Sequence, residues 1–154
     1  MMRADYYAIV KKICFDIFEQ LAFMFGDELD KNDVESSDND FIKATMIFSG
    51  HHGGAVDIIV PRQLTPVLVY NILGMDENNH IDGDIAEDAL KELLNTLCGR
   101  MLPALFTDIA TFDLHPPEIA AISRKQWMDI LDQQDTIAFA IEESPVLVNV
   151  HFDE

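Results

Sequence analysis

The sequence predicts an α+β protein in which an antiparallel sheet packs against long helices. Two periodicities support this fold class. Apolar residues recur at helical spacing in residues 4–25 and 84–105, whereas apolar and polar residues alternate in residues 41–60 and 137–150. Each alternating segment contains two short runs joined by a turn, as in antiparallel strands. The chain of 154 residues is long enough for a substantial core, so we expect a single domain over residues 1–154.

The first expected helix covers residues 4–25. Gly26 stands where a helix C-cap is expected, directly after the last residue of the helical period. The aromatic side chains of this helix spread over more than one face, so the sequence allows both a thick core and contact with another subunit. Residues 27–40 hold seven acids and almost no apolar side chain, and they lack the residue order of a calcium loop. We therefore expect a solvated loop there.

Residues 41–48 and 56–60 are the first expected strand pair, because their apolar and polar residues alternate. The turn between them, residues 49–54, is rich in glycine. It also contains His51 and His52, but adjacent histidine side chains diverge and no third ligand stands nearby in the sequence. The sequence therefore favours a turn over a metal site at this point.

A second helix is expected over residues 62–73. Pro66 is tolerated in its first turn, where backbone amides have no partner within the helix, and Gly74 ends it. The apolar side chains that we expect to pack on the strands are Leu68, Ile72 and Leu73.

A loop at residues 75–84 leads into the longest expected helix, residues 84–105. Four residues on one side of this helix, Asp88, Glu92, Asn95 and Gly99, form a narrow polar stripe about 16 Å long. Glycine in an exposed helix costs about 1 kcal/mol relative to alanine, so local stability does not explain this choice of residues. The opposite, apolar side consists of Leu90, Leu93, Leu94, Leu97, Met101, Ala104 and Leu105.

Pro103 complicates the end of this helix. A proline removes the hydrogen bond to the carbonyl group four residues earlier, here that of Gly99. We therefore expect the helix to bend or stop near residues 99–103.

The last third of the chain predicts a short helix and three strands. Pro116 and Pro117 open an extended run over residues 118–122. Ser123 and Gln126 have the spacing of a capping box, which predicts the start of a short helix. The last two expected strands are residues 137–141 and 146–150.

Composition and charge exclude several classes of function. Ten Lys and Arg against 28 Asp and Glu give a formal charge of −18, which disfavours nucleic acid and anionic membranes as partners. No apolar run reaches the length of a membrane span and no signal-peptide region is present, so we expect a cytoplasmic protein. Cys14 and Cys98 lack the spacing of a metal or redox site, and we expect them to be reduced and buried.

The spacing of the polar stripe is similar to that of a known family. Asp88, Glu92 and Asn95 are separated by three and two residues, and Pro117 follows after 21 more. Gly99 lies four residues past the asparagine. This pattern resembles that of the bacterial chemotaxis phosphatases CheC, CheX and FliY. Because the chain carries only one such helix, it resembles the single-site CheX type, which the resemblance associates with a homodimer.

The resemblance implies an enzyme that hydrolyses the aspartyl phosphate of a CheY-type response regulator. Asn95 would position the attacking water and Glu92 would meet the active-site lysine of the regulator. Asp88, Gly99 and Pro117 would support the site. The chain shows no nucleophile or metal cluster of its own, so we expect no cofactor here and Mg²⁺ on the regulator.

Two other functions remain compatible with the same sequence. The helix could belong to a non-catalytic module that binds a response regulator or a component of the flagellar switch. The sheet could also carry a small-molecule sensor, although no polar cluster within the apolar segments indicates a ligand.

Overall fold

The structure is a computed structural model, and it describes residues 4–36, 38–76, 82–106 and 111–153. Its helices are α1 (Ala4–Ala22), η1 (Lys31–Asp33), η2 (Arg62–Leu64), α2 (Thr65–Leu73), α3 (Gly83–Leu105) and α4 (Arg124–Leu131). Its strands are β1 (Gly26–Glu28), β2 (Asp40–Gly50), β3 (Gly54–Pro61), β4 (Phe112–Leu114), β5 (Glu118–Ser123), β6 (Thr136–Ile141) and β7 (Ser144–Phe152).

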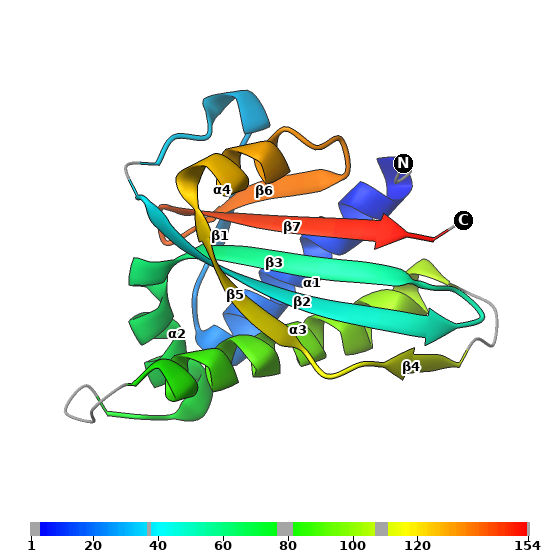
Figure 1. The fold of residues 1–154 in the computed structure, drawn as a ribbon, viewed down its shortest axis with the longest axis horizontal. Helices are drawn as coiled ribbons and strands as arrows, with labels where there is room; N and C mark the ends of the chain where they lie inside the picture. The colour runs from blue at the N-terminus through cyan, green and yellow to red at the C-terminus, as the bar shows by residue number, and fades with distance from the viewer. Residues whose placement is uncertain (1–3, 37, 77–81, 107–110, 154) are drawn as a thin grey trace.

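The described strands form one antiparallel sheet with the order β1-β6-β7-β3-β2-β4, and β5 also pairs with β2. Figure 1 shows α1 and α3 behind this sheet and α4 in front of it. The main apolar core lies between the sheet and helices α1, α2 and α3. The expected α+β fold, with an antiparallel sheet against long helices, is therefore confirmed.

A smaller core lies on the other face of the sheet, under α4. The ring of Trp127 stacks on Phe41 with a centroid distance of 4.7 Å. The helix starts with the expected capping box. The Ser123 hydroxyl oxygen accepts from the backbone N–H of Gln126, and the side-chain oxygen of Gln126 accepts from the backbone N–H of Ser123. The sheet is thus buried on one face by three helices and on part of the other face by one.

Strand β2 organises the edge of the sheet nearest to α3. One side of β2 pairs with β3 along most of its length, as the alternating pattern predicted. The other side is shared, because residues 40–45 pair with β5 and residues 48–50 pair with β4. Strand β4 was not predicted, because it is only three residues long and too short for an alternating pattern to be recognised.

The end of the first helix differs from the prediction. Helix α1 stops at Ala22, and the residue with a left-handed backbone is Phe23, with φ of 55°, instead of Gly26. Gly26 starts strand β1, where an added Cβ would lie 2.4 Å from a ring carbon of Phe15. The glycine therefore serves a close approach between the strand and α1, and the helix ends three residues before the predicted position.

The segment predicted as a plain solvated loop, residues 27–40, contains two short elements. Residues 26–28 form the edge strand β1 on β6, and η1 is capped by Asp30, which accepts from the Asn32 amide at 2.9 Å. An edge strand is held by backbone hydrogen bonds, so its side chains can remain acidic and exposed. Most of the segment is exposed to solvent, as predicted, but the prediction that it has no secondary structure was wrong.

The second helix has the predicted end, and its predicted packing is right for two of three residues. Gly74 adopts a left-handed conformation with φ of 67°, as expected of a C-cap. Residues 62–64 form a separate 3-10 turn before α2. Leu68 is buried in the main core together with residues of the strands, and Ile72 packs against that core, as predicted. Leu73 is exposed, because it is the last residue of the helix, directly before the Gly74 cap.

The β6–β7 hairpin turns through two residues with a left-handed backbone. Glu142 has φ of 48° and Glu143 has φ of 71°, as required by a type I′ turn. Non-glycine residues pay about 1 kcal/mol or more for this conformation. The Glu142 carboxylate is engaged, because it accepts from the Phe25 amide at 3.4 Å, whereas Glu143 is exposed.

Glu143→Gly is therefore expected to raise the free energy of unfolding by about 0.5–1 kcal/mol, because glycine adopts the left-handed backbone without strain. Chemical denaturation measures the change. Glu118→Gly, at an exposed position in β5, is the matched control and should lower the same quantity. Equal destabilisation by both changes would contradict the proposed strain.

Candidate functional site

One side of α3 is buried along its whole length. The buried residues are Ala89, Leu90, Leu93, Leu94, Leu97, Cys98, Met101, Leu102 and Leu105. Ala104, which the sequence placed on this side, is exposed. The reason is that the buried side moves around the helix: the early turns bury Ala89 and Leu93, whereas the last turn buries Leu102 and Leu105.

The opposite side of α3 carries the polar stripe. Asp88, Glu92, Asn95 and Gly99 are all exposed. An added Cβ at Gly99 would meet no other group within 4 Å. The structure thus brings four of the five expected site residues onto one open helix surface.

Both ends of α3 are capped by local hydrogen bonds. At the start, the Asp82 carboxylate accepts from the Ile85 amide at 3.0 Å. At the end, the Phe106 amide donates to the Leu102 carbonyl at 3.0 Å. The helix continues through Pro103 to Leu105 and does not stop at the proline. The loop predicted before this helix falls partly on residues 77–81, which lie outside the described residues.

The side chains of Glu92 and Asn95 are open to another molecule. Within the described residues, neither side chain makes a hydrogen bond or an ion pair; only the backbone carbonyl of Glu92 is used, by the Thr96 hydroxyl at 2.9 Å. The carboxylate lies one helical turn before the amide on the same side. The surface thus presents a charged hydrogen-bond acceptor, the Glu92 carboxylate, next to the Asn95 side-chain amide, which can both donate and accept.

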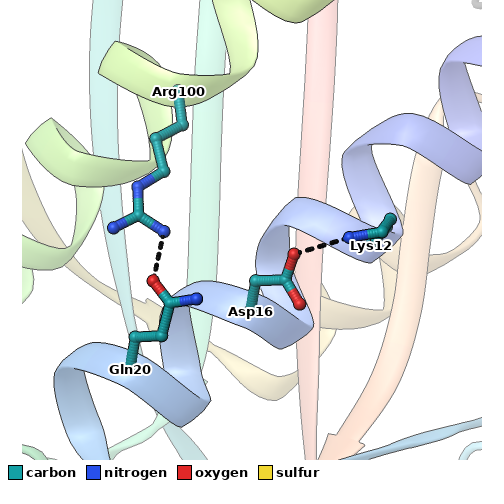
Figure 2. A network of polar contacts seen from close by, with 4 residues as sticks. All are labelled: Lys12, Asp16, Gln20 and Arg100. Carbon is teal, nitrogen blue, oxygen red and sulfur yellow. Dashed lines mark hydrogen bonds and ion pairs between the residues drawn. The ribbon is translucent and has the colours of Figure 1, made fainter.

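A cation that the spacing of the stripe did not single out lies beside its last residue, about 100° further around the helix and on the side that faces α1. Arg100 follows Gly99, and its Nη1 donates to Oε1 of Gln20 on α1 at 2.7 Å (Figure 2). On α1 the neighbouring Lys12 and Asp16 form their own ion pair at 2.9 Å. Arg100 and Gln20 are 80 residues apart in the sequence, so no local pattern could reveal their contact.

Pro117 is the one expected site residue that is not on α3. It precedes β5 and lines a small pocket with Thr45 and Ile47. Those two β2 residues alternate with the buried Ala44 and Met46, so they lie on the face of the sheet opposite α3. The proline therefore belongs to the entry into β5, the strand whose Ile119 and Ala121 line a pocket with Leu90 of α3.

The described residues offer no reactive thiol. Cys14 and Cys98 are free and buried, as the sequence predicted. Burial raises the pKa of the Cys14 thiol, with a further contribution from Cys98, and burial raises the pKa of Cys98 to about 12. Both thiols are protonated at neutral pH and unsuited to nucleophilic attack. Among the described residues there is also no group of three or more His, Cys, Asp or Glu that could hold a metal ion.

The His51–His52 turn has a packing role. The imidazole ring of His52 stacks on Phe106 with a centroid distance of 4.0 Å, which ties the β2–β3 turn to the end of α3.

None of the helices in the described ranges has the length and apolar character needed to cross a bilayer.

The family model for the chemotaxis phosphatase CheX matches residues 42–138. The chain belongs to the CheX family. The matched region includes the whole of α3 and most of the sheet. A comparison of this CheX-family chain with curated proteins gives no match.

Solved structures show the same fold. The chemotaxis protein CheX from Desulfovibrio desulfuricans is 15% identical, with a TM-score of 0.70 over 97% of this chain and 99% of that one. CheX from Vibrio vulnificus is 13% identical, with a TM-score of 0.69 over 99% of each chain. The CheX–CheY–BeF3–Mg²⁺ complex from Borrelia burgdorferi has a chain that is 13% identical, with a TM-score of 0.63 over 99% of this chain and 100% of that one.

Gly99→Ala is expected to raise the free energy of unfolding by about 1 kcal/mol, because alanine favours the helix and the new methyl group meets open space. Thermal or chemical denaturation measures this change. Gly54→Ala is the control: its Cβ would lie 2.0 Å from the His151 carbonyl oxygen, so that variant should lose stability. A loss of stability in the Gly99 variant would show that the glycine is required by the fold.

Proposed function

We propose that this CheX-family protein accelerates hydrolysis of the aspartyl phosphate on a CheY-type response regulator. The observation that carries the proposal is the open surface of α3, where the unengaged amide of Asn95 lies one turn after the unengaged carboxylate of Glu92. The described residues contain neither a reactive thiol nor a metal cluster. A site of this kind works when its substrate supplies the remaining groups.

A phosphorylated receiver domain supplies those groups. Its own Mg²⁺ and lysine neutralise the phosphoryl oxygens, and what remains is to place a water molecule in line with the scissile bond. Asn95 can donate its amide N–H to the phosphoryl group while its carbonyl oxygen accepts from the water. Water attacks phosphorus, the bond between phosphorus and the aspartyl oxygen breaks, and the products are inorganic phosphate and the free aspartate carboxylate.

A neutral amide suits this position better than a carboxylate. An acid at residue 95 would add a negative charge beside the phosphoryl group, where screening by water is weak. Glu92, one turn earlier, is the residue that meets the receiver lysine and sets the docking register. Asp88 extends the acidic end of the stripe, and Gly99 lets the receiver backbone approach closely.

The fold of known complexes supports this partner. The Borrelia burgdorferi structure contains CheX bound to CheY with BeF3 and Mg²⁺, and its CheX-like chain shares the fold of this protein. We extend the same class of partner to this chain. The proposal also places the protein in the cytoplasm, where response regulators act, and includes the homodimer that the resemblance implies.

Asn95→Ala is expected to leave folding and receiver binding nearly intact while it lowers dephosphorylation by about 10- to 1,000-fold, the scale of losing one positioning contact. Phosphate release from a receiver charged with acetyl phosphate measures the effect. Asn39→Ala, an exposed amide before β2, is the control and should behave as the wild type. Wild-type turnover by the Asn95 variant would remove the catalytic assignment and favour a non-catalytic binding module.

Glu92→Lys is expected to weaken receiver binding by at least about 100-fold, because it places a cation against the receiver lysine. Titration of the receiver loaded with beryllofluoride measures the dissociation constant. Glu87→Lys makes the same charge change at an exposed position of α3 away from the stripe, and it should have a much smaller effect. Similar dissociation constants for the Glu92 variant and the wild type would show that the docking orientation is wrong.

A further inference from the structure

Charge is distributed unevenly along α3. The acids of the helix, including Asp88 and Glu92, all lie in its first half, and Asn95 is neutral. From Leu93 to Leu105 the only charged residue is Arg100. Lys91 stands among the acids, so the first half of the helix has mixed charge, whereas the second half has one positive charge on the flank of the stripe that faces α1. The chain has only ten Lys and Arg against 28 acids, so a cation beside the stripe is a distinctive feature.

The guanidinium group of Arg100 is held in place by a neutral group, so its positive charge is not compensated. It is exposed and donates one hydrogen bond to the neutral amide of Gln20 on α1 at 2.7 Å (Figure 2). An arginine has five N–H donors, so most of its hydrogen-bonding capacity is still available. Among the described residues no carboxylate pairs with it. The contact with Gln20 thus orders the side chain without neutralising it.

We propose that Arg100 is a second electrostatic docking residue, which fixes the direction in which the receiver domain lies on α3. The proposal rests on the proposed function, because it assumes that Asn95 enters the phosphorylated site. Arg100 lies eight positions after Glu92, which places the two residues about 12 Å apart along the helix axis. Arg100 contacts a carboxylate on the acidic side of the receiver site, while Glu92 contacts the lysine on the other side.

This arrangement selects one orientation by repulsion as well as by attraction. The receiver site is itself polar, since a lysine lies on one side of the phosphoryl group and carboxylates that bind Mg²⁺ lie near it. A receiver docked in the reverse direction would place its lysine near Arg100 and its carboxylates near Glu92 and Asp88. Like charges at close range repel each other, which disfavours that orientation.

Gln20 acts as a positioning residue for Arg100. A free arginine side chain loses rotamer freedom when it binds a partner, and a prior hydrogen bond reduces that loss. A planar guanidinium also suits a carboxylate better than an ammonium group does. The competing explanation is a brace, in which the hydrogen bond only ties α1 to α3. A brace would affect the stability of the fold but not the affinity for the receiver.

The test compares two charge reversals on neighbouring helices. Arg100→Glu should raise the dissociation constant for the receiver loaded with beryllofluoride by about 10-fold or more, with a weaker effect at high salt. Lys12→Glu is the matched control: it makes the same change in net charge on α1, where Lys12 already pairs with Asp16, and it should change the constant less than about 2-fold.

Two further variants separate docking from bracing. Arg100→Lys should retain part of the affinity, and Gln20→Ala should weaken binding by about 2- to 5-fold. In both, kcat at saturating phosphorylated receiver should remain within about 2-fold of the wild type, because the water-positioning amide is untouched. A loss of thermal stability in Arg100→Glu without any change in affinity would identify a brace and overturn the inference.

The remaining outcomes are also decisive. Equal effects of Arg100→Glu and Lys12→Glu would show that only net charge matters, which overturns the inference. If the wild type and the Arg100→Glu variant bind and dephosphorylate the receiver equally well, the proposed function stands and this docking role is removed. A wild-type protein that does not bind the receiver overturns the proposed function itself.

Discussion

The burial of one side of α3 is the constraint on which the site depends. Leu93, Leu97 and Met101 are almost completely buried against the core, and burying each such side chain contributes about 1.5–3 kcal/mol. A rotation of the helix that hid Asn95 would expose these three side chains, at a cost comparable to the 5–15 kcal/mol of stability that a typical domain has. The polar stripe is therefore held toward solvent by the packing on the opposite side of the same helix.

Much of the fold could be predicted because its signals are local. The helical period of α3 and the alternation in β2, β3, β6 and β7 are properties of consecutive residues, and the structure follows them. The errors occur where tertiary contacts override local rules. Phe23 takes the left-handed position that was assigned to Gly26, since the glycine is needed where β1 passes Phe15. Strands β1 and β4 were missed because each has only three residues and is held by backbone pairing to a longer strand.

The same distinction explains how much of the candidate site could be predicted. The residues of the stripe lie on one helix, so their spacing alone places them on one side. The contact between Arg100 and Gln20 joins positions 80 residues apart and requires the packing of two helices to be known. Pro117 shows the opposite limit, because its spacing from Asn95 does not predict the path of the 21 residues between them, and the structure places it directly before β5.

The acidic chain can bind an anionic partner because electrostatic interactions act only over short distances at physiological salt. A formal charge of −18 would repel a phosphorylated receiver at low ionic strength. At physiological salt the Debye length is about 8 Å, so charges farther from the contact than this are largely screened. The groups that remain effective are those on or beside the stripe, namely Asp88, Lys91, Glu92 and Arg100. Because these few charges have both signs in a fixed order, the local surface can be complementary to a receiver site even though the protein as a whole is strongly acidic.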